Sequence, residues 1–138
     1  MDTLLSGRCL CGAVQVSTRM KINQVGACHC DICRTWGGGP MLAIGGEDTH
    51  LDGEQSIAIY SSTAWAERGF CKQCGTHLFI RVKQSGRMIL PAGLFGATPA
   101  LHFDHQIFVD RKPDYYEFAN ATKNMTGAEV FAQHAPVT

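Results

Sequence analysis

The stretch FCKQCGTHLFIRV, residues 70–82, places a pair of cysteines directly before an apolar segment. Cys71 and Cys74 are separated by two residues, a spacing at which both sulfurs can reach one metal ion. Gly75 follows, a residue that lets the backbone turn tightly around a metal. HLFIRV, rich in β-branched and aromatic residues, is typical of a β-strand. The stretch therefore predicts a metal-binding turn carried by β-structure.

Short strand-like segments recur along the chain, separated by glycines and turn residues about every eight to twelve positions. The others are AVQVST, MLAIGG, SIAIYS, MILPAG and QIFVD. In SIAIYS, Ile57 and Ile59 share one face while Ala58 and Tyr60 share the other, as the two-residue period of a strand requires. We expect an all-β (mainly β) domain whose core is built from such faces.

Helices and loops have weaker signals. DICRTW favours about one helical turn, and TGAEVFAQHA favours a short helix in which Thr126 caps the start and Glu129 lies three positions later. GGEDTHLDGEQ, residues 45–55, is expected to be a polar loop between strands. Residues after about Phe118 lose the strand pattern and are expected to pack loosely.

Length and composition indicate one globular domain spanning residues 1–138, with 45% hydrophobic and 17% charged residues. Twelve Lys and Arg balance twelve Asp and Glu, so the charged surface that nucleic-acid binders need is not expected. The N-terminus lacks a signal-peptide pattern, and no window approaches the roughly 18 apolar residues of a membrane span. We expect a cytoplasmic protein without nucleic-acid or membrane partners, and the composition is compatible with an oligomer.

All seven cysteines fall into three clusters: Cys9 and Cys11, then Cys28, Cys30 and Cys33, then Cys71 and Cys74. Disulfides and inert buried thiols are the alternatives to metal binding. A cytoplasmic setting, an odd count and the close bunching all argue against them. Zinc is the expected ion because an all-sulfur tetrahedral site suits it, and iron or an iron–sulfur cluster is the main rival.

Seven ligands divide most naturally as four plus three. The two distant pairs can close a structural zinc site with four sulfurs, which joins an early hairpin to a late one: Cys9, Cys11, Cys71 and Cys74. The triplet then holds a second zinc with an open fourth position, as catalytic zinc sites do: Cys28, Cys30 and Cys33. A site of three thiolates readily accepts a fourth, so a small-molecule thiol is the expected substrate class.

Side chains near the triplet suggest few further ligands. If Cys28 and Cys30 point to one side of an extended chain, His29 must point to the other. Arg34 would offset the negative charge or bind a substrate carboxylate, or it is a surface arginine. Other residues are candidates for the site but are more often packing or surface residues: His77, His102 and His105 as ligands, and Trp36, Trp65 and Phe95 as pocket lining.

The motifs GRCLCGAV, CHCDICR, GFCKQCGTHLF and, more loosely, HQIFVDRKPDYYE together resemble the glutathione-dependent formaldehyde-activating enzyme (GFA) family, also called the CENP-V/GFA domain family. The resemblance covers about residues 6–117. It implies an Mss4-like β fold and two zinc ions, one structural and one catalytic. The implied partition of the cysteines is the one that the ligand count favours.

The resemblance also implies a carbon–sulfur lyase activity, in which glutathione and formaldehyde give S-hydroxymethylglutathione. The sequence departs from the family pattern at His77 and at the pair Tyr115 and Tyr116, where relatives often have tryptophan. The alternative function is a non-catalytic, zinc-stabilised protein-binding module of the Mss4-like fold. A redox or metal sensor that uses the triplet as a switch is a third.

Overall fold

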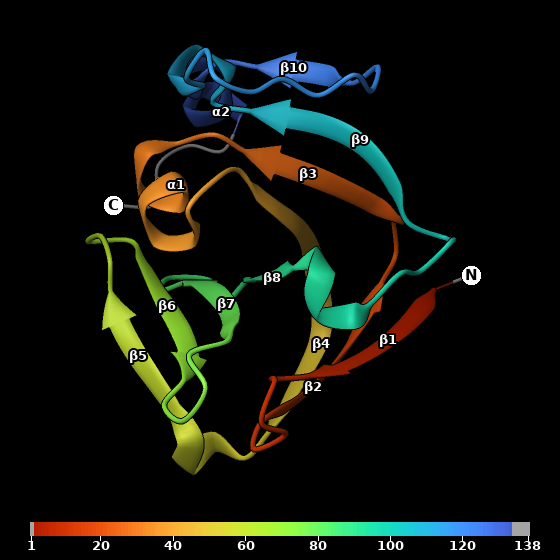
Figure 1. Cartoon of the computed structure of the whole chain (residues 1–138), viewed down its shortest axis with the longest axis vertical. Coiled ribbons are helices and arrows are strands. Elements are labelled where there is room, and N and C mark those ends of the chain that lie inside the picture. The colour runs from red at the N-terminus through yellow and green to blue at the C-terminus, as the bar shows by residue number, and fades with distance from the viewer. Residues whose placement is uncertain (1, 134–138) are drawn as a thin grey trace.

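The computed structural model describes residues 2–133, and its ten strands join in one sheet (Figure 1). The strands are β1 (Thr3–Arg8), β2 (Gln15–Met20), β3 (Gln24–Cys28), β4 (Met41–Asp52), β5 (Ile57–Ser61), β6 (Ala66–Cys71), β7 (His77–Val82), β8 (Met88–Pro91), β9 (His102–Ile107) and β10 (Lys123–Met125). The helices are α1 (Asp31–Gly37), α2 (Gly127–Gln133) and the 3₁₀ turns η1 (Glu54–Ser56), η2 (Ala92–Phe95) and η3 (Val109–Arg111). The mainly β fold class predicted from the sequence is confirmed. Between residues 2 and 133, no helix is long and apolar enough to cross a membrane.

The sheet has the strand order β10-β9-β3-β4-β8-β7-β6-β5, and the β1–β2 hairpin branches from β4. Strand β9 runs parallel to β3 and to β10, whereas the other pairs are antiparallel. Figure 1 shows the sheet curling, with the β1–β2 hairpin on one side and β5–β7 on the other. This curvature brings segments distant in sequence together around a common interior.

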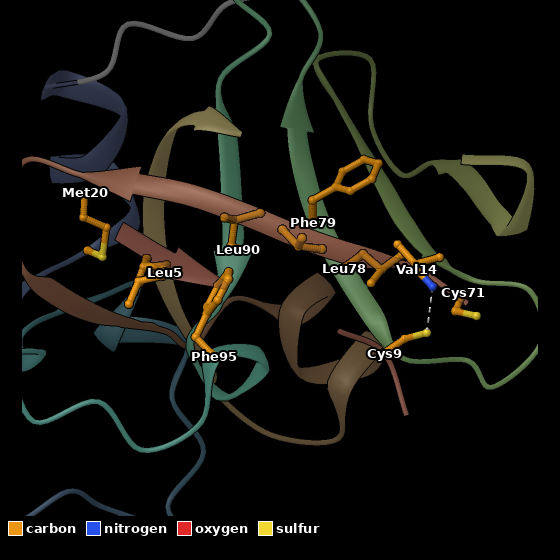
Figure 2. Close-up of a cluster of buried hydrophobic side chains, with 11 residues drawn as sticks. Leu5, Cys9, Val14, Met20, Cys71, Leu78, Phe79, Leu90 and Phe95 are labelled. Carbon is orange, nitrogen blue, oxygen red and sulfur yellow. Dashed lines mark hydrogen bonds between the residues drawn. The ribbon is translucent and has the colours of Figure 1, made fainter. Parts of the chain in front are cut away.

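The main core lies between the β1–β2 hairpin and strands β4, β7 and β8. Its buried members are Leu5, Cys9, Val14, Val16, Met20, Ile44, Cys71, Leu78, Phe79, Leu90 and Phe95. Figure 2 shows Cys9 and Cys71 at one end of this cluster, beside Val14 and Leu78. One pair of cysteine sulfurs is therefore anchored in the core. Phe95 was a candidate either to line a pocket or to pack in the core, and the structure places it in the core.

Strand β4 continues through most of the segment that was expected to be a polar loop. Its first part pairs with β8, and its second part pairs with β2. The loop prediction is wrong for residues 45–52, because two different partner strands satisfy the backbone of this long strand, whereas residues 53–55 do lie in the connection between β4 and β5. The exposed positions of β4 carry most of its polar side chains, and this polarity led to the loop prediction.

Strand β5 forms where SIAIYS predicted a strand, but it lies at an edge of the sheet. Ile57 packs against the core, whereas Ile59 is 51% exposed and Tyr60 is 65% exposed. The expectation that both isoleucines build the core is therefore wrong. Among the described strands, β6 is its only partner, and the outer half of β5 is exposed.

The segment after Phe118 contains a strand that the sequence pattern did not indicate and the short helix that it did indicate. β10 adds to β9, and α2 follows it directly. Thr126 and Glu129 form the predicted reciprocal cap, with N–H···O distances of 2.9 and 3.2 Å. Loose packing remains a prediction for residues 123–133, most of which are exposed. The last two residues of the predicted helical segment lie outside the described residues.

Candidate metal centres and active site

Two tight turns carry the first group of cysteines. Cys9 and Cys11 follow β1, and Gly12, at φ +81°, donates its N–H to the carbonyl of Cys9 at 3.0 Å. Cys71 ends β6, and the turn beyond Cys74 closes through the N–H of Gly75, at φ +76°, donated to the carbonyl of Cys71 at 2.9 Å. A left-handed glycine ends each turn because a side chain would be strained there.

The four thiols of these turns converge on one point: all Sγ atoms of Cys9, Cys11, Cys71 and Cys74 lie within 4.8 Å of one another. The Sγ of Cys11 lies 3.6 Å from that of Cys9 and 3.7 Å from that of Cys71. Zinc–sulfur bonds of about 2.3 Å in a tetrahedron would separate the sulfurs by about 3.8 Å. The donor set and its spacing therefore fit a four-sulfur zinc site.

Hydrogen bonds hold the two turns together. Leu10 donates its N–H to Oγ1 of Thr76 at 3.1 Å, which links the early turn to the late one. Val14 donates its N–H to Sγ of Cys9 at 3.3 Å, as Figure 2 shows. N–H donation to sulfur is a contact that favours the thiolate form needed to bind metal.

The second group of cysteines lies where β3 passes into α1. Cys28 ends β3, Cys30 caps the N-terminus of α1, and Cys33 is buried within that helix. The N–H of Cys33 donates to Sγ of Cys30 at 3.4 Å, so a ligand also starts the helix. The three Sγ atoms lie within 4.8 Å of one another, and α1 ends at Gly38, at φ +83°.

The three thiols of this group interact strongly. Hydrogen bonds from Cys28 and Cys33 lower the pKa of Cys30 to about 2. Hydrogen bonds to the same cluster raise the pKa of Cys28 well above its ordinary value. One thiolate is therefore favoured in the free site, and a bound cation is what would allow all three to ionise.

His29 lies between two of these cysteines but faces the other way. Its Nδ1 lies 2.7 Å from the hydroxyl of Tyr116, and its Nε2 lies 2.8 Å from Oε1 of Gln106. The amide of Gln106 donates to Thr122 at 2.8 Å, so its oxygen accepts from Nε2–H of His29. Nδ1 then accepts from Tyr116, and burial lowers the pKa of His29. Both ring nitrogens are used, in agreement with the expectation that His29 points away.

The side chain of Arg34 donates hydrogen bonds to oxygen atoms and not to the cysteine sulfurs of residues 2–133. Its Nε donates to the carbonyl of His29 at 2.9 Å, and its Nη2 donates to Asp31 at 2.5 Å. Asp31 also pairs with Arg111. In the free protein these contacts tie the cysteine loop to α1. A role of Arg34 in offsetting the site charge or binding a substrate carboxylate stays a prediction.

Arg68 of β6 is the arginine that contacts a cysteine of the triplet. Its Nη2 lies 3.6 Å from Sγ of Cys33, and its guanidinium lies 4.9 Å from the ring centre of Trp36. Trp36 stacks on His77 at 3.6 Å and 5°, and burial followed by the charge of Arg68 lowers the pKa of His77. No motif in the sequence marks Arg68 as a site residue, although strand alternation places it on the same face as the buried Ala66.

The remaining candidates join neither group of cysteines. His102 is exposed on β9, and His105 pairs with Asp104 at 3.2 Å. Trp65 is partly exposed in the turn before β6. Within residues 2–133, neither His102 nor His105 is among the side chains that converge with the cysteines, so both remain packing or surface residues.

Comparison with known proteins places the chain in a family. The model of the glutathione-dependent formaldehyde-activating enzyme family matches residues 4–111. The chain belongs to this family. It is 35% identical over 126 residues to an uncharacterized lyase of Schizosaccharomyces pombe, which corresponds to 90% of this chain and 92% of that protein. Membership of the GFA family and the lyase relative support a glutathione-related, lyase-type function.

A solved structure gives an independent comparison of the fold. The crystal structure of a Rhodobacter sphaeroides protein superposes with a TM-score of 0.57 at 22% identity. It covers 69% of this chain and 92% of its own. At this identity the comparison supports the fold, which is consistent with the Mss4-like architecture that the family resemblance implied.

A cleft of about 400 Å³ opens beside the triplet of this GFA family member. Its wall includes Cys30 and the apolar side chains of Ile32, Phe108 and Phe131. Its charged lining residues are Arg111 and two carboxylates, Asp31 and Asp110. Phe108 and Phe131 pack edge to face at 5.6 Å, so α2 builds one side of the cleft. The cleft can admit a small molecule to the cysteine loop.

Proposed function

We propose that this protein is a carbon–sulfur lyase of the S-hydroxymethylglutathione synthase type, with glutathione and formaldehyde as its substrates. One observation carries the proposal: three thiols lie within 4.8 Å of one another, and no fourth Cys, His, Asp or Glu of residues 2–133 joins them. A tetrahedral ion held there keeps one position for a ligand from solution. Family membership selects glutathione among the possible thiols.

The proposed catalytic residues are Cys28, Cys30 and Cys33, which would hold the catalytic zinc. The structural zinc would be held by Cys9, Cys11, Cys71 and Cys74. Bound at the triplet, zinc would supply a soft Lewis acid that favours the thiolate form of a bound thiol. The remaining residues position this loop: Arg34 binds the carbonyl of His29, and the ring of His29 binds Gln106 and Tyr116.

The proposed reaction adds a thiol across an aldehyde. The glutathione sulfur forms a bond to the formaldehyde carbon while the carbon–oxygen double bond becomes single. The proton lost by the thiol is gained by the oxygen, so atoms and electrons balance without an oxidant or reductant. The lyase direction reverses each change.

The cleft beside Cys30 is the proposed entry for the tripeptide. Its apolar wall can contact the glutathione backbone, and Arg111 at its rim supplies a positive charge for a carboxylate. Arg111 pairs with Asp31 in the free protein, so a substrate carboxylate would compete with an existing partner.

The test combines metal content with a direct measurement of exchange. Zinc per chain is measured for the native protein and for Cys30→Ser, and exchange between ¹³C-formaldehyde and its glutathione adduct is followed by NMR. We expect about two zinc ions in the native protein. We also expect exchange faster than the spontaneous rate, and loss of that acceleration in Cys30→Ser with an unchanged circular dichroism spectrum.

Cys11→Ser is the matched control, because it removes a thiol of the other group. It should lose zinc and stability but retain acceleration at a temperature where it is folded. Two tightly held zinc ions without acceleration would contradict the proposal and favour the zinc-stabilised protein-binding module. Full acceleration in Cys30→Ser would also contradict it.

A further inference from the structure

Arg68 is a buried cation that pairs with no carboxylate side chain of residues 2–133. It is 6% exposed. Its Nη1 is buried and has no hydrogen-bond partner in the same part of the chain. A buried charge without a partner strongly destabilises a folded protein. A residue held at that cost needs a compensating negative charge.

The contacts of Arg68 point to the triplet as the source of that charge. Nη2 lies 3.6 Å from Sγ of Cys33, and Nε donates to the hydroxyl of Ser62 at 3.4 Å. The face of the guanidinium rests on Trp36. Ser62 and Trp36 are neutral, so the cysteine sulfur is the contact that can carry a negative charge.

The charge balance of a filled site supports this assignment. Three thiolates and a dication carry a net charge of about −1, and a guanidinium, which stays protonated in proteins, brings the local sum to about zero. A thiolate in the open position would add one more negative charge, whereas a neutral ligand would add none. Nη1 of Arg68, which has no hydrogen-bond partner among residues 2–133, is available to donate a hydrogen bond beside this site.

We propose that Arg68 is the built-in counter-charge of the three-cysteine site, and that it favours anionic over neutral molecules as the fourth ligand. The inference rests on the proposed function, because it requires a metal at the triplet. It makes Arg68 a positioning residue that acts through the charge of the site. The ligand class that it selects is a deprotonated thiol.

Zinc affinity at the triplet gives the first test. It is measured by competition with a fluorescent chelator in Arg68→Met and in Arg68→Lys, which keeps the charge. We expect Arg68→Met to weaken this site about tenfold or more, and Arg68→Lys to weaken it by about threefold or less. The four-cysteine site should be unaffected in both variants.

Arg81→Met is the matched control. Arg81 lies on the adjacent strand, over the ring of Phe79 at 4.7 Å, but it is paired with Glu67 at 3.0 Å. Its removal should leave zinc affinity at the triplet within about twofold of the native value, since it is not next to a cysteine. Equal weakening by Arg81→Met and Arg68→Met would overturn the inference.

Ligand selectivity gives the second test, with cobalt(II) at the triplet as the spectroscopic probe. Glutathione and imidazole are titrated separately, and the change in cobalt absorption is recorded. In Arg68→Met, the glutathione concentration that gives half of the absorption change should rise about tenfold. The imidazole concentration that gives half of its absorption change should differ by about twofold or less from that of the native protein. A purely structural role would weaken both ligands equally, and that result would overturn the inference.

These measurements separate the two proposals. Native protein that binds metal and glutathione at the triplet but does not accelerate exchange would contradict the proposed reaction and leave the role of Arg68 standing. Acceleration with unchanged metal and thiol affinity in Arg68→Met would contradict the role of Arg68 alone. Native protein whose triplet takes up no metal would overturn both.

Discussion

His29 shows how a single residue links the cysteine loop to the C-terminal part of the chain. Its ring accepts from Tyr116 and donates to Gln106, which lies on β9. The two cysteines that flank it face the opposite side. The loop is thus held on the side opposite its sulfurs by one buried and one partly buried hydrogen bond, and the sulfurs stay free for other ligands.

Removing the hydroxyl of Tyr116 tests this link. Tyr116→Phe leaves Nδ1 of the buried His29 without its donor, and it should lower the free energy of unfolding by about 1–2 kcal/mol. Tyr115→Phe is the control, because Tyr115 is 77% exposed and its hydroxyl has no such partner among the described residues. Denaturant unfolding of the zinc-saturated variants measures both changes. Equal stability of the two variants would contradict the role given to His29.

At the scale of single elements, β6 and β7 fit together through a glycine. A Cβ atom at Gly69 would lie 2.2 Å from Cζ of Phe79, whose ring is fully buried in the core that Figure 2 shows. The two residues are directly paired across the strands. The strand that carries Arg68 therefore depends on the next residue having no side chain.

Gly69→Ala should destabilise the protein by about 1–3 kcal/mol, because the methyl group displaces a core ring. Gly45→Ala on β4 is the matched control, since the nearest atom to its Cβ would be 3.7 Å away. That change should stay within about 0.5 kcal/mol. Thermal unfolding of both variants checks the contrast, and a destabilised Gly45→Ala would count against the steric explanation.

Helix α2 depends on the reciprocal cap at its start. Thr126→Ala removes the hydroxyl that accepts from Glu129 and should destabilise the helix by about 1 kcal/mol. Thr126→Ser retains an acceptor and should behave like the native protein. Amide hydrogen exchange in residues 127–133 measures the change. Faster exchange in both variants would contradict the capping role.

At the scale of the whole molecule, the four-cysteine group joins two hairpins that lie far apart in sequence. Cys11 lies 60 positions from Cys71, and the sulfur atoms are 3.7 Å apart. A metal held there would stabilise the folded state only, because the unfolded chain does not bring the four sulfurs together. Its binding energy would then contribute directly to folding.

Cys11→Ser tests this contribution with little loss of packing, since Cys11 is exposed. In the presence of zinc, the variant should be less stable than the native protein by more than about 3 kcal/mol. In the presence of a strong chelator, the two proteins should have the same stability. Chemical denaturation under both conditions checks this, and a difference that persists in chelator would show that the thiol acts by packing.

Local chemistry explains what the sequence alone determined. Two cysteines one or two positions apart can share an ion whatever the rest of the chain does, so the clusters were evident from spacing. The turn at Gly75 and the cap at Thr126 also depend on neighbouring residues only. Segments such as HLFIRV indicated mainly β structure through composition and period. The division of the cysteines into two groups was predicted from the same spacing. Once the three closely spaced cysteines are assigned to one site, the two remaining pairs are left for the other.

Tertiary structure decided everything that depends on strand pairing across long separations. Residues 45–52 became part of β4 because two partner strands satisfy their backbone, and β5 became an exposed edge because, among residues 2–133, only β6 pairs with it. The same pairing brings Arg68 to Cys33, 35 positions away. No local pattern encodes that contact, since both the register of β6 and the placement of α1 are set by the packing of the whole sheet.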